Sequence, residues 1–340
     1  MEVTTVEQIK SWVRPEDMER IDSIEKANKF ISEQTEEIKS AVAEKKAAAY
    51  LFCEFRSSVA AALTAKALGD RLLCIHTDSG FIPQKVSEAT VSFFRDKTDA
   101  ELICIDGKES FMEVLSEDLD GYAKRTHSIK LHQNIFFDET EKRGDIGFIV
   151  SSETYPQILE QMKDAHIKVQ RYRRKSVKKN PADNYEIISP LCYLYHDEVR
   201  LIGKALGLPD EIIYTRPITP SGLASRCTGK ITKERLEALH RADTILCEEF
   251  EKCGLADRLY QYFIVIPDIV SVGVKDESRY EGYPAVIRAV TTRDGVTADI
   301  GEIPYSVLHA VTNRIITEVP GINRVLYDLS PKPVATIEWE

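Results

Sequence analysis

Apolar strand-like runs alternate with amphipathic helical segments from Ala47 to about Tyr214, and this alternation restricts the fold more than any other feature of the sequence. Successive parallel strands need a crossover connection, usually a helix, so the pattern predicts an α/β fold with a doubly wound parallel sheet. The expected strands are Ala47–Phe52, Leu72–His76, Glu101–Asp106, Ile146–Ser151 and a short one near Ile187. The amphipathic stretch HDEVRLIGKALGLP, residues 196–209, is expected to be the helix that closes this part of the chain.

The segments on either side have different patterns. Residues 1–45 are predicted to be helical, because SIEKANKFISEQTEEIKSAVAEKK spaces its apolar residues three and four apart. Beyond about residue 219, helices and strands no longer alternate regularly, which is typical of an α+β module. A chain of 340 residues exceeds one ordinary core. We therefore predict a helical N-terminal extension (1–45), an α/β domain (46–219) and an α+β domain (220–340).

Composition and charge exclude several classes of protein. No apolar run approaches the roughly 20 residues that cross a bilayer. The N-terminal stretch MEVTTVEQIKSWVRPEDMER lacks the pattern of a targeting peptide. Seven cysteines without CxxC pairing suit a reducing compartment, and a formal charge of −10 argues against general nucleic-acid binding. We expect a cytoplasmic protein, with no membrane and no nucleic acid among its partners.

The first predicted strand runs directly into a helix, and that junction is a candidate anion site. The first N–H groups of a helix are unpaired and point outward, so they bind phosphate well. Phosphate-binding turns at such places are usually rich in glycine. This turn instead holds Cys53, Glu54, Phe55 and Arg56, and Ser57 and Ser58 are expected to cap the helix.

A basic run, HIKVQRYRRKSVKKNP (residues 166–181), departs from the acidic character of the chain. It contains Arg171, Arg173, Arg174 and Lys175. An ordinary solvated loop is one interpretation of such a run. A lid over polyphosphate is another, because arginine and lysine pair well with phosphate, and an RNA-binding arm is a weaker third.

Three long stretches resemble the GMP synthetase family. They are NRIITEVPGINRVLYDLSPKPVATIEWE at the C-terminus, SVGVKDESRYEGYPAVIRAVTTRDGVTAD before it, and ISPLCYLYHDEVRLIGKALGLPDEIIYTRPITPSGLASRCTGKITKERL. The resemblance implies an ATP-pyrophosphatase domain of the adenine nucleotide alpha hydrolase type, followed by a C-terminal dimerisation domain. No G-x-C-x-G element of a glutaminase occurs, so we expect a synthetase subunit that receives ammonia from a separate glutaminase.

The family's reaction uses ATP and Mg²⁺ to adenylate O2 of XMP, after which ammonia displaces AMP and gives GMP. Its phosphate loop reads Ser-Gly-Gly-Val-Asp-Ser-Ser-Val, and residues 52–59 of this chain align with it as FCEFRSSV. The resemblance thus implies that Ser57, Ser58, Asp78 and Gly80 face ATP, with Asp78 a candidate catalytic residue. Both loop glycines are absent and Arg56 replaces the loop aspartate, so we expect weak or absent ATP binding at this turn.

The purine side of the resemblance is better preserved. Lys332, Ile337 and Glu338 fall on positions that the family uses for the XMP phosphate and base, and Arg216 and Gly222 belong to the same expected purine site. A terminal strand packed into a dimer interface would explain the three tail residues equally well. Arg288 is expected to form a buried ion pair at that interface.

Three functions remain open at this point. The first is an active subunit that makes GMP or an analogue. The second is a non-catalytic relative that binds a purine nucleotide, or a partner subunit, without ATP pyrophosphatase activity. The third is a nucleotide-modifying enzyme with a changed substrate. In each case we expect a homodimer formed through residues 221–340, where edge strands and an apolar helix face need covering.

Overall fold

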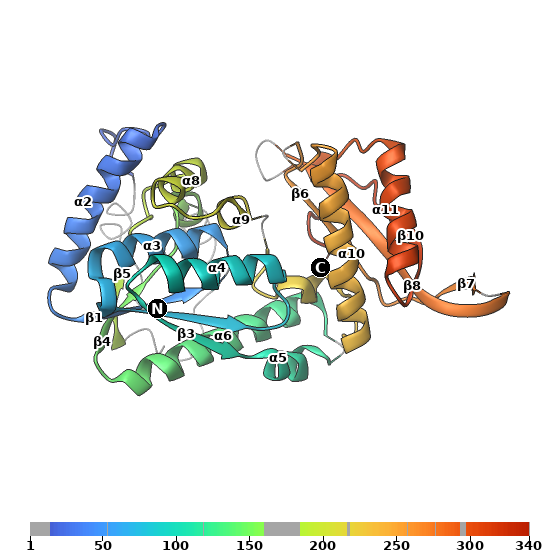
Figure 1. Ribbon diagram of the computed structural model, residues 1–340, viewed down its shortest axis with the longest axis horizontal. Coiled ribbons are helices and arrows are strands. Elements are labelled where there is room, and N and C mark those ends of the chain that lie inside the picture. The colour runs from blue at the N-terminus through green and yellow to red at the C-terminus, as the bar shows by residue number, and fades with distance from the viewer. Residues whose placement is uncertain are drawn as a thin grey trace, which may run out of the picture. The chain divides into compact units, whose positions relative to one another are not determined.

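The chain folds as two units, shown in Figure 1. The computed structural model describes residues 14–52, 54–117, 119–159, 184–215, 218–256, 258–275, 277–292 and 297–339. The first unit comprises the described residues within Met1–Asp78, Gln84–Ile105 and Gln133–Thr215. The second comprises those within Ser79–Pro83, Asp106–His132 and Arg216–Glu340.

A five-stranded sheet forms the centre of the first unit, with the order β3-β2-β1-β4-β5. Its strands are β1 (Lys46–Leu51), β2 (Leu72–Asp78), β3 (Glu101–Asp106), β4 (Ile146–Val150) and β5 (Glu186–Ile188). The pairs β1–β2, β1–β4 and β4–β5 are parallel. The α/β fold with a parallel sheet, predicted from the alternating pattern, is therefore confirmed.

Helices cover both faces of this sheet, because its inner strands are apolar on both sides. Ala47, Ala49 and Leu51 of β1 belong to a core shared with α2 (Ile24–Val42), α3 (Phe55–Leu68) and α8 (His196–Ala205). Ala48, between them, packs on the other face with Phe136 of α6 (Gly121–Arg143). Among the described residues, this unit also contains α4 (Gln84–Lys97), α9 (Asp210–Ile213) and the short η1 (Gly69–Arg71).

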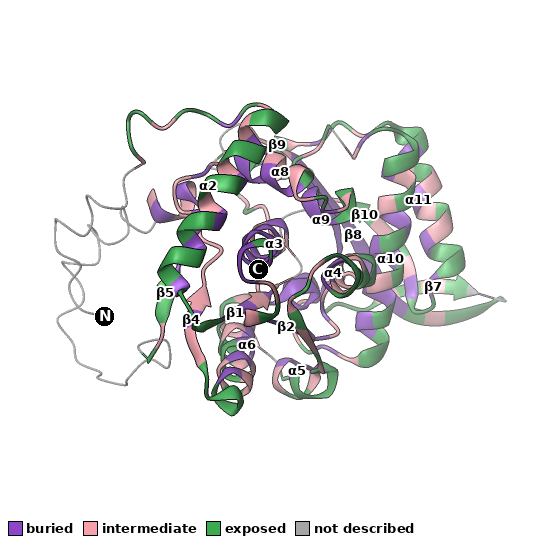
Figure 2. Cartoon of the chain, turned by 60° about the vertical axis from the view of Figure 1, so that its left-hand side comes forward, coloured by how far each residue is buried: buried purple, intermediate pink, exposed green. Residues whose placement is uncertain are grey.

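Helix α3 is buried on nearly all sides, as its burial colours in Figure 2 show. Its sequence, FRSSVAAALTAKAL, is mostly small and apolar, and such a helix belongs inside a structure, not at its surface. It contacts β1, α2 and α8. Packing along the whole length of α3 therefore fixes the position of its N-terminus.

The strand order locates the binding edge of the sheet. From β1 the order runs to β2 and β3 on one side and to β4 and β5 on the other. Open α/β sheets bind ligands outside the carboxyl ends of the strands at the point where the order reverses. In this unit that point lies beyond the ends of β1 and β4, at the turn into α3 and at the segment that follows Val150.

The second unit contains an α+β module. Its central strands have the order β10-β8-β6, and β7 and β9 also pair with β8. The strands are β6 (Gln261–Val265), β7 (Ser271–Lys275), β8 (Ser278–Thr291), β9 (Asp299–Ile300) and β10 (Ile322–Tyr327). Helix α10 (Lys233–Lys252) contacts β6, α11 (Tyr305–Glu318) contacts β10, and the two helices contact each other. The described part of this unit also contains helix α5 (Lys108–Leu115), the 3-10 turn η3 (Gly222–Arg226) and α6 as far as His132.

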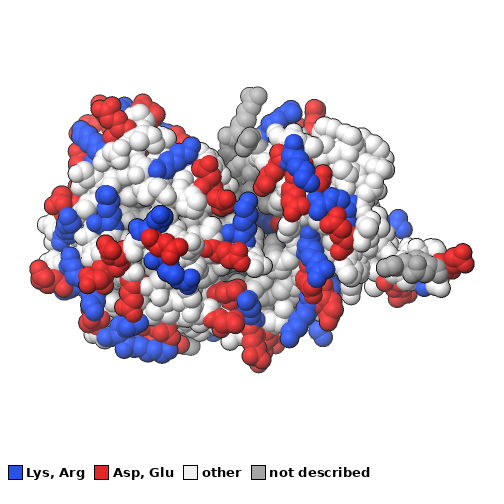
Figure 3. Space-filling view, in the orientation of Figure 1, with Lys and Arg blue, Asp and Glu red and all other residues white. Residues whose placement is uncertain are grey.

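The surface mixes charges of both signs. On the face shown in Figure 3, lysine and arginine side chains are interspersed with aspartate and glutamate. Among the described residues, none of the helices has the length and apolar character needed to span a membrane.

Candidate functional site

The turn between β1 and α3 is capped by an acidic side chain. Glu54 is the N-cap residue, and its Oε1 accepts a hydrogen bond from Ser57 N at 2.9 Å. Its Oε2 accepts from Arg56 N at 3.3 Å and from Arg56 Nε at 2.8 Å. The expectation that Ser57 and Ser58 cap this helix is wrong, because the longer Glu54 side chain reaches the first-turn N–H groups from the position before the helix.

The two serines instead lie inside the first turn. Ser57 Oγ donates to Glu54 O at 3.1 Å and accepts from Phe52 N at 3.2 Å, so it ties the end of the strand to the helix. Ser58 is fully buried, and its Oγ has no hydrogen-bond partner in the described part of the chain. Cys53 lies outside the described residues.

A histidine with a lowered pKa lies beside this turn. His196 Nε2 is 3.2 Å from Thr154 Oγ1, and its ring meets the edge of the Phe55 ring at 5.5 Å between centroids. Burial, and then the positive charges of Arg56 and Arg200, lower the pKa of His196 below its usual value. Thr154, from the segment after β4, is thus linked through His196 to the turn before α3. These groups surround the reversal point of the sheet.

The turn does not fit a Mg²⁺-pyrophosphate group. Magnesium prefers carboxylate oxygens, whereas the Glu54 carboxylate is already held by Arg56 and by two N–H groups. Arg56 adds a positive charge where the family has an aspartate. Within the described ranges, no three His, Cys, Asp or Glu side chains are grouped to hold a metal ion.

The other residues expected to face ATP belong to different units. Asp78 is the last residue of β2 in the first unit, and it is half-buried. Gly80 belongs to the second unit, where its carbonyl oxygen accepts a hydrogen bond from His240 Nε2 at 2.9 Å. The proposed lid residues Arg171, Arg173, Arg174 and Lys175, and the purine-site residue Arg216, lie outside the described residues.

A buried arginine shapes the C-terminal tail of the second unit. Arg288 of β8 is fully buried and donates to Ser330 O at 2.6 Å, to Thr336 O at 2.8 Å and to Ile337 O at 3.4 Å. It also pairs with Asp328 at 3.2 Å. The expected ion pair of Arg288 therefore forms, and its partner Asp328 belongs to the same chain, because the tail folds back over β8. A place for this pair at a dimer interface stays a prediction.

Lys332, Ile337 and Glu338, the three tail residues expected at the purine site, all form hydrogen bonds to residues of the second unit that lie beside the tail. The main chain of Lys332 exchanges hydrogen bonds of 2.8 and 2.9 Å with Ala298. The Ile337 carbonyl binds Arg288, as described above. The Glu338 carboxylate accepts hydrogen bonds from Gln261 Nε2 at 2.5 Å and from Arg226 at 3.4 Å. The structure thus brings Glu338 beside Arg226, the last residue of the η3 turn that begins at Gly222.

An open cavity of about 370 Å³ lies within this tail. It is lined by Asp328, Ser330, Val334, Ala335, Thr336 and Trp339. Trp339 Nε1 donates to Asp328 Oδ2 at 3.0 Å, which fixes an aromatic ring at the edge of the cavity. Sequence reasoning missed Trp339, although a tryptophan next to Glu338 in a segment already singled out was a usable signal.

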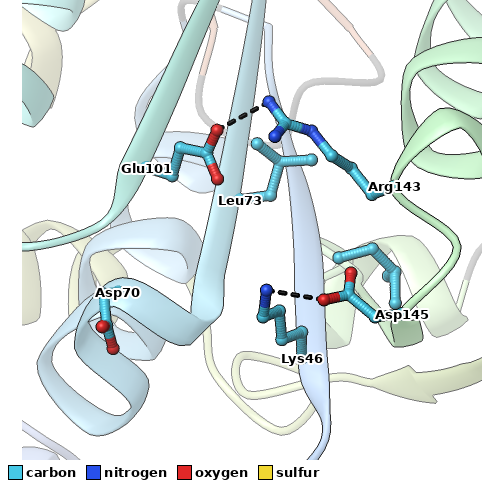
Figure 4. A pocket seen from close by; sticks show the side chains of 7 residues that line it. Lys46, Asp70, Leu73, Glu101, Arg143 and Asp145 are labelled. Atoms are coloured by element: carbon cyan, nitrogen blue, oxygen red, sulfur yellow. Dashed lines mark ion pairs between the residues drawn. The ribbon is translucent and has the colours of Figure 1, made fainter.

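A second cavity, of about 150 Å³, lies at the opposite edge of the first unit's sheet, near the starts of β1, β3 and β4. Figure 4 shows its two ion pairs, Lys46 with Asp145 and Arg143 with Glu101, each at 2.6 Å. The hydrogen bond with Asp145 raises the pKa of Lys46, and the same contact lowers the pKa of Asp145. Because its charges pair with one another at the edge away from the reversal point, this cavity is not a candidate site.

Comparison with known proteins gives one family. The model for the GMP synthase C terminal domain matches residues 248–339. A glutamine-hydrolysing GMP synthase of Symbiobacterium thermophilum is 40% identical over 312 residues, which are 92% of this chain and 60% of that protein. The corresponding enzyme of Geobacillus kaustophilus is also 40% identical, with 92% and 61% covered. The chain therefore spans about 60% of the length of these relatives.

A solved structure, NMN synthetase from Francisella tularensis, matches 59% of this chain and 77% of its own, with a TM-score of 0.41 and 15% identity. A putative glutamine-hydrolysing GMP synthase 2 of Bacteroides thetaiotaomicron is 39% identical over 312 residues, and here the match covers 92% of this chain and 71% of the relative. The sequence similarity to these GMP synthases covers 92% of the chain and so runs through both units. It confirms the resemblance found in the sequence: the chain belongs to the GMP synthase family.

Proposed function

We propose that this member of the GMP synthase family binds a purine mononucleotide through the tail of its second unit and does not carry out the ATP pyrophosphatase step. The observation that carries the proposal is the ordered tail, in which Arg288 holds residues 328–337 around an open cavity of about 370 Å³. Lys332, Ile337 and Glu338, which resemble the family's XMP contacts, all lie in or beside this segment.

The chemistry of the tail suits a nucleotide. Trp339 offers an aromatic ring to a base, and Ser330 and Thr336 offer hydroxyl groups. Lys332 supplies a positive charge for a phosphate. Glu338 is held by Arg226 and Gln261 before any ligand arrives, so its carboxylate is oriented in advance.

The turn before α3 is the reason why we propose nucleotide binding by the tail without the ATP pyrophosphatase step. A triphosphate needs close approach to the backbone and open N–H groups. Here the turn has no glycine, and the N–H groups of Arg56 and Ser57 already donate to Glu54. ATP-dependent amination of XMP with ammonia from a separate glutaminase remains the second candidate, favoured by about 40% identity to GMP synthases along 92% of the chain.

Calorimetry with XMP and GMP, together with a pyrophosphate-release assay, tests the proposal. We expect both nucleotides to bind and no pyrophosphate to be released with ATP, Mg²⁺, XMP and ammonia. Lys332→Ala should weaken nucleotide binding roughly tenfold to a hundredfold, because a charge-assisted hydrogen bond to phosphate is lost. Lys252→Ala, which removes an exposed lysine on α10, is the matched control and should leave the affinity unchanged.

Salt dependence separates the tail from the basic run. Neutralising Arg173 and Arg174 should weaken binding mainly at low salt, since exposed charges are screened within about 8 Å at physiological ionic strength. The Lys332→Ala effect should persist at all salt concentrations. Unchanged affinity in Lys332→Ala, or no binding of either nucleotide by the native protein, would disprove the tail site. Pyrophosphate release by the native protein would restore amination as the function.

A further inference from the structure

The N-terminus of α3 already holds an anion, and the chain itself supplies it. Helix α3 is 14 residues long, and its first-turn N–H groups attract negative charge at the edge of the sheet where α/β proteins bind ligands. The Glu54 carboxylate accepts three hydrogen bonds there: from Ser57 N at 2.9 Å, from Arg56 N at 3.3 Å and from Arg56 Nε at 2.8 Å. Two backbone N–H groups and a guanidinium are the donors that a phosphate group would use.

Helix capping alone does not account for a glutamate at this position. Serine, aspartate and asparagine are the preferred N-cap residues, because their short side chains reach the N–H groups of the first turn. The longer Glu54 side chain also reaches Arg56, so it pairs with both the helix terminus and the Arg56 guanidinium. The side chains of Arg56 and Glu54 are 25% and 16% exposed, which leaves this pair within reach of a solute.

Ser58 provides a second and independent observation. Its hydroxyl lies in the same first turn, is fully buried, and lacks a hydrogen-bond partner among the residues that the structure describes. Buried hydroxyls in native proteins nearly always have a partner. The turn therefore retains a hydroxyl that the Glu54 carboxylate does not satisfy.

We propose that Glu54 is a built-in substitute for a phosphate group: its carboxylate closes the N-terminus of α3 to external polyanions, and Arg56 holds it in place. This inference extends the part of the proposed function that concerns this turn, where Glu54 only explains why the ATP step is not carried out, and it does not depend on nucleotide binding by the tail. It implies that a single substitution at Glu54 opens a pyrophosphate site in this chain.

Calorimetry of the full chain with inorganic pyrophosphate tests the proposal. In Glu54→Ser the new side chain still caps α3, but the competing charge is gone and Arg56 is released. We expect pyrophosphate to bind this variant roughly tenfold to a hundredfold more tightly than the native protein, as the recovery of charge-assisted hydrogen bonds requires. Adding Arg56→Gln to Glu54→Ser should remove most of that gain.

Glu25→Ser is the matched control. It makes the same change of charge in the first turn of another helix, α2, where Ser23 is the N-cap and Glu25 is exposed. Glu25→Ser should not increase the affinity for pyrophosphate, and this result would exclude a general effect of net charge. If Glu54→Ser fails to fold, as judged by circular dichroism and thermal unfolding, the isosteric Glu54→Gln replaces it.

Each outcome then has one meaning. The proposal is overturned if the native protein binds pyrophosphate as tightly as Glu54→Ser, or if no folded Glu54 variant gains binding. Pyrophosphate release from ATP by the native protein would contradict both this inference and the proposed function, whereas a native protein that binds neither XMP nor GMP would contradict the proposed function alone. The two failures are therefore separable.

Discussion

Gly222 and Gly254 share a left-handed backbone, with φ of +58° and +64°, but their surroundings differ completely. A Cβ at position 222 would lie 2.1 Å from Phe81 O, and Leu223 N donates to that same oxygen at 2.7 Å. A Cβ at position 254 would meet no atom within 4 Å. Gly222 was expected to be a purine-site residue. Its left-handed backbone and its close approach to Phe81 O are sufficient to explain why a glycine stands there.

This difference gives a prediction at the scale of a single residue. Gly254→Ala should cost about 1 kcal/mol, the price of a left-handed alanine. Gly222→Ala should cost at least about 3 kcal/mol, because the backbone of residues 79–83 or of the η3 turn must also shift. Urea denaturation of both variants measures the difference, and equal losses would show that the close approach to Phe81 is unimportant.

At the scale of the element, one carboxylate anchors the start of α8. The buried Glu198 side chain accepts hydrogen bonds from Arg14 at 2.6 and 3.0 Å, from Tyr195 N at 2.8 Å and from Ile21 N at 2.9 Å. Burial acts to raise its pKa, but the bonds from Arg14, Tyr195 N and Ile21 N outweigh burial and hold the pKa below its usual value of 4.5. The ionised form is therefore favoured by folding.

The sign of the pH dependence follows. A carboxyl group with a lowered pKa stabilises the fold above its unfolded pKa and loses that contribution as the pH falls through its folded pKa. Glu198→Gln should lower the free energy of unfolding by on the order of 3 kcal/mol at pH 7, because Arg14 loses its buried partner. The difference in the free energy of unfolding between the native protein and Glu198→Gln should shrink as the pH falls below about 4.5. Denaturation from pH 7 to pH 3.5 measures it.

Asp197→Asn is the control for this element. Asp197 is the neighbouring residue, but its side chain is 66% exposed and pairs with the exposed Arg20. Exposed pairs contribute under about 1 kcal/mol. A loss in Asp197→Asn as large as that in Glu198→Gln, or a pH-independent loss in Glu198→Gln, would contradict the assignment.

Elements were predictable from the sequence where a local pattern decides them. The expected strand Glu101–Asp106 is β3 to the residue, and the expected first strand, Ala47–Phe52, is β1 shifted by one residue at each end. The choice of cap at α3 was not predictable, because serine is a common N-cap residue and only the folded turn shows Glu54 reaching its N–H groups. Nor was the contact of Arg226 with Glu338, since 112 positions separate them and tertiary folding alone joins them.

At the scale of the whole molecule, the β7–β8 hairpin offers the apolar surface that a homodimer needs. Val272 and Val274 are two positions apart on β7, so their side chains share one face, and they are 44% and 76% exposed. Val270, just before β7, is 61% exposed. Monomeric proteins rarely expose clustered apolar side chains, whereas two-fold interfaces bury them. We therefore expect a dimer formed through residues 221–340, with this hairpin in the interface.

Sedimentation at micromolar concentration tests that expectation. The native chain should sediment as a dimer, and the double variant Val272→Glu, Val274→Glu should shift towards monomer, because two carboxylates would have to be buried without partners. Tyr122→Glu places a charge at an 81% exposed aromatic residue of α6, outside residues 221–340, and should remain dimeric. A monomeric native chain would refute the dimer. A dimer that survives both valine substitutions would place the interface away from the hairpin, since exposed strand positions tolerate glutamate only where water reaches them.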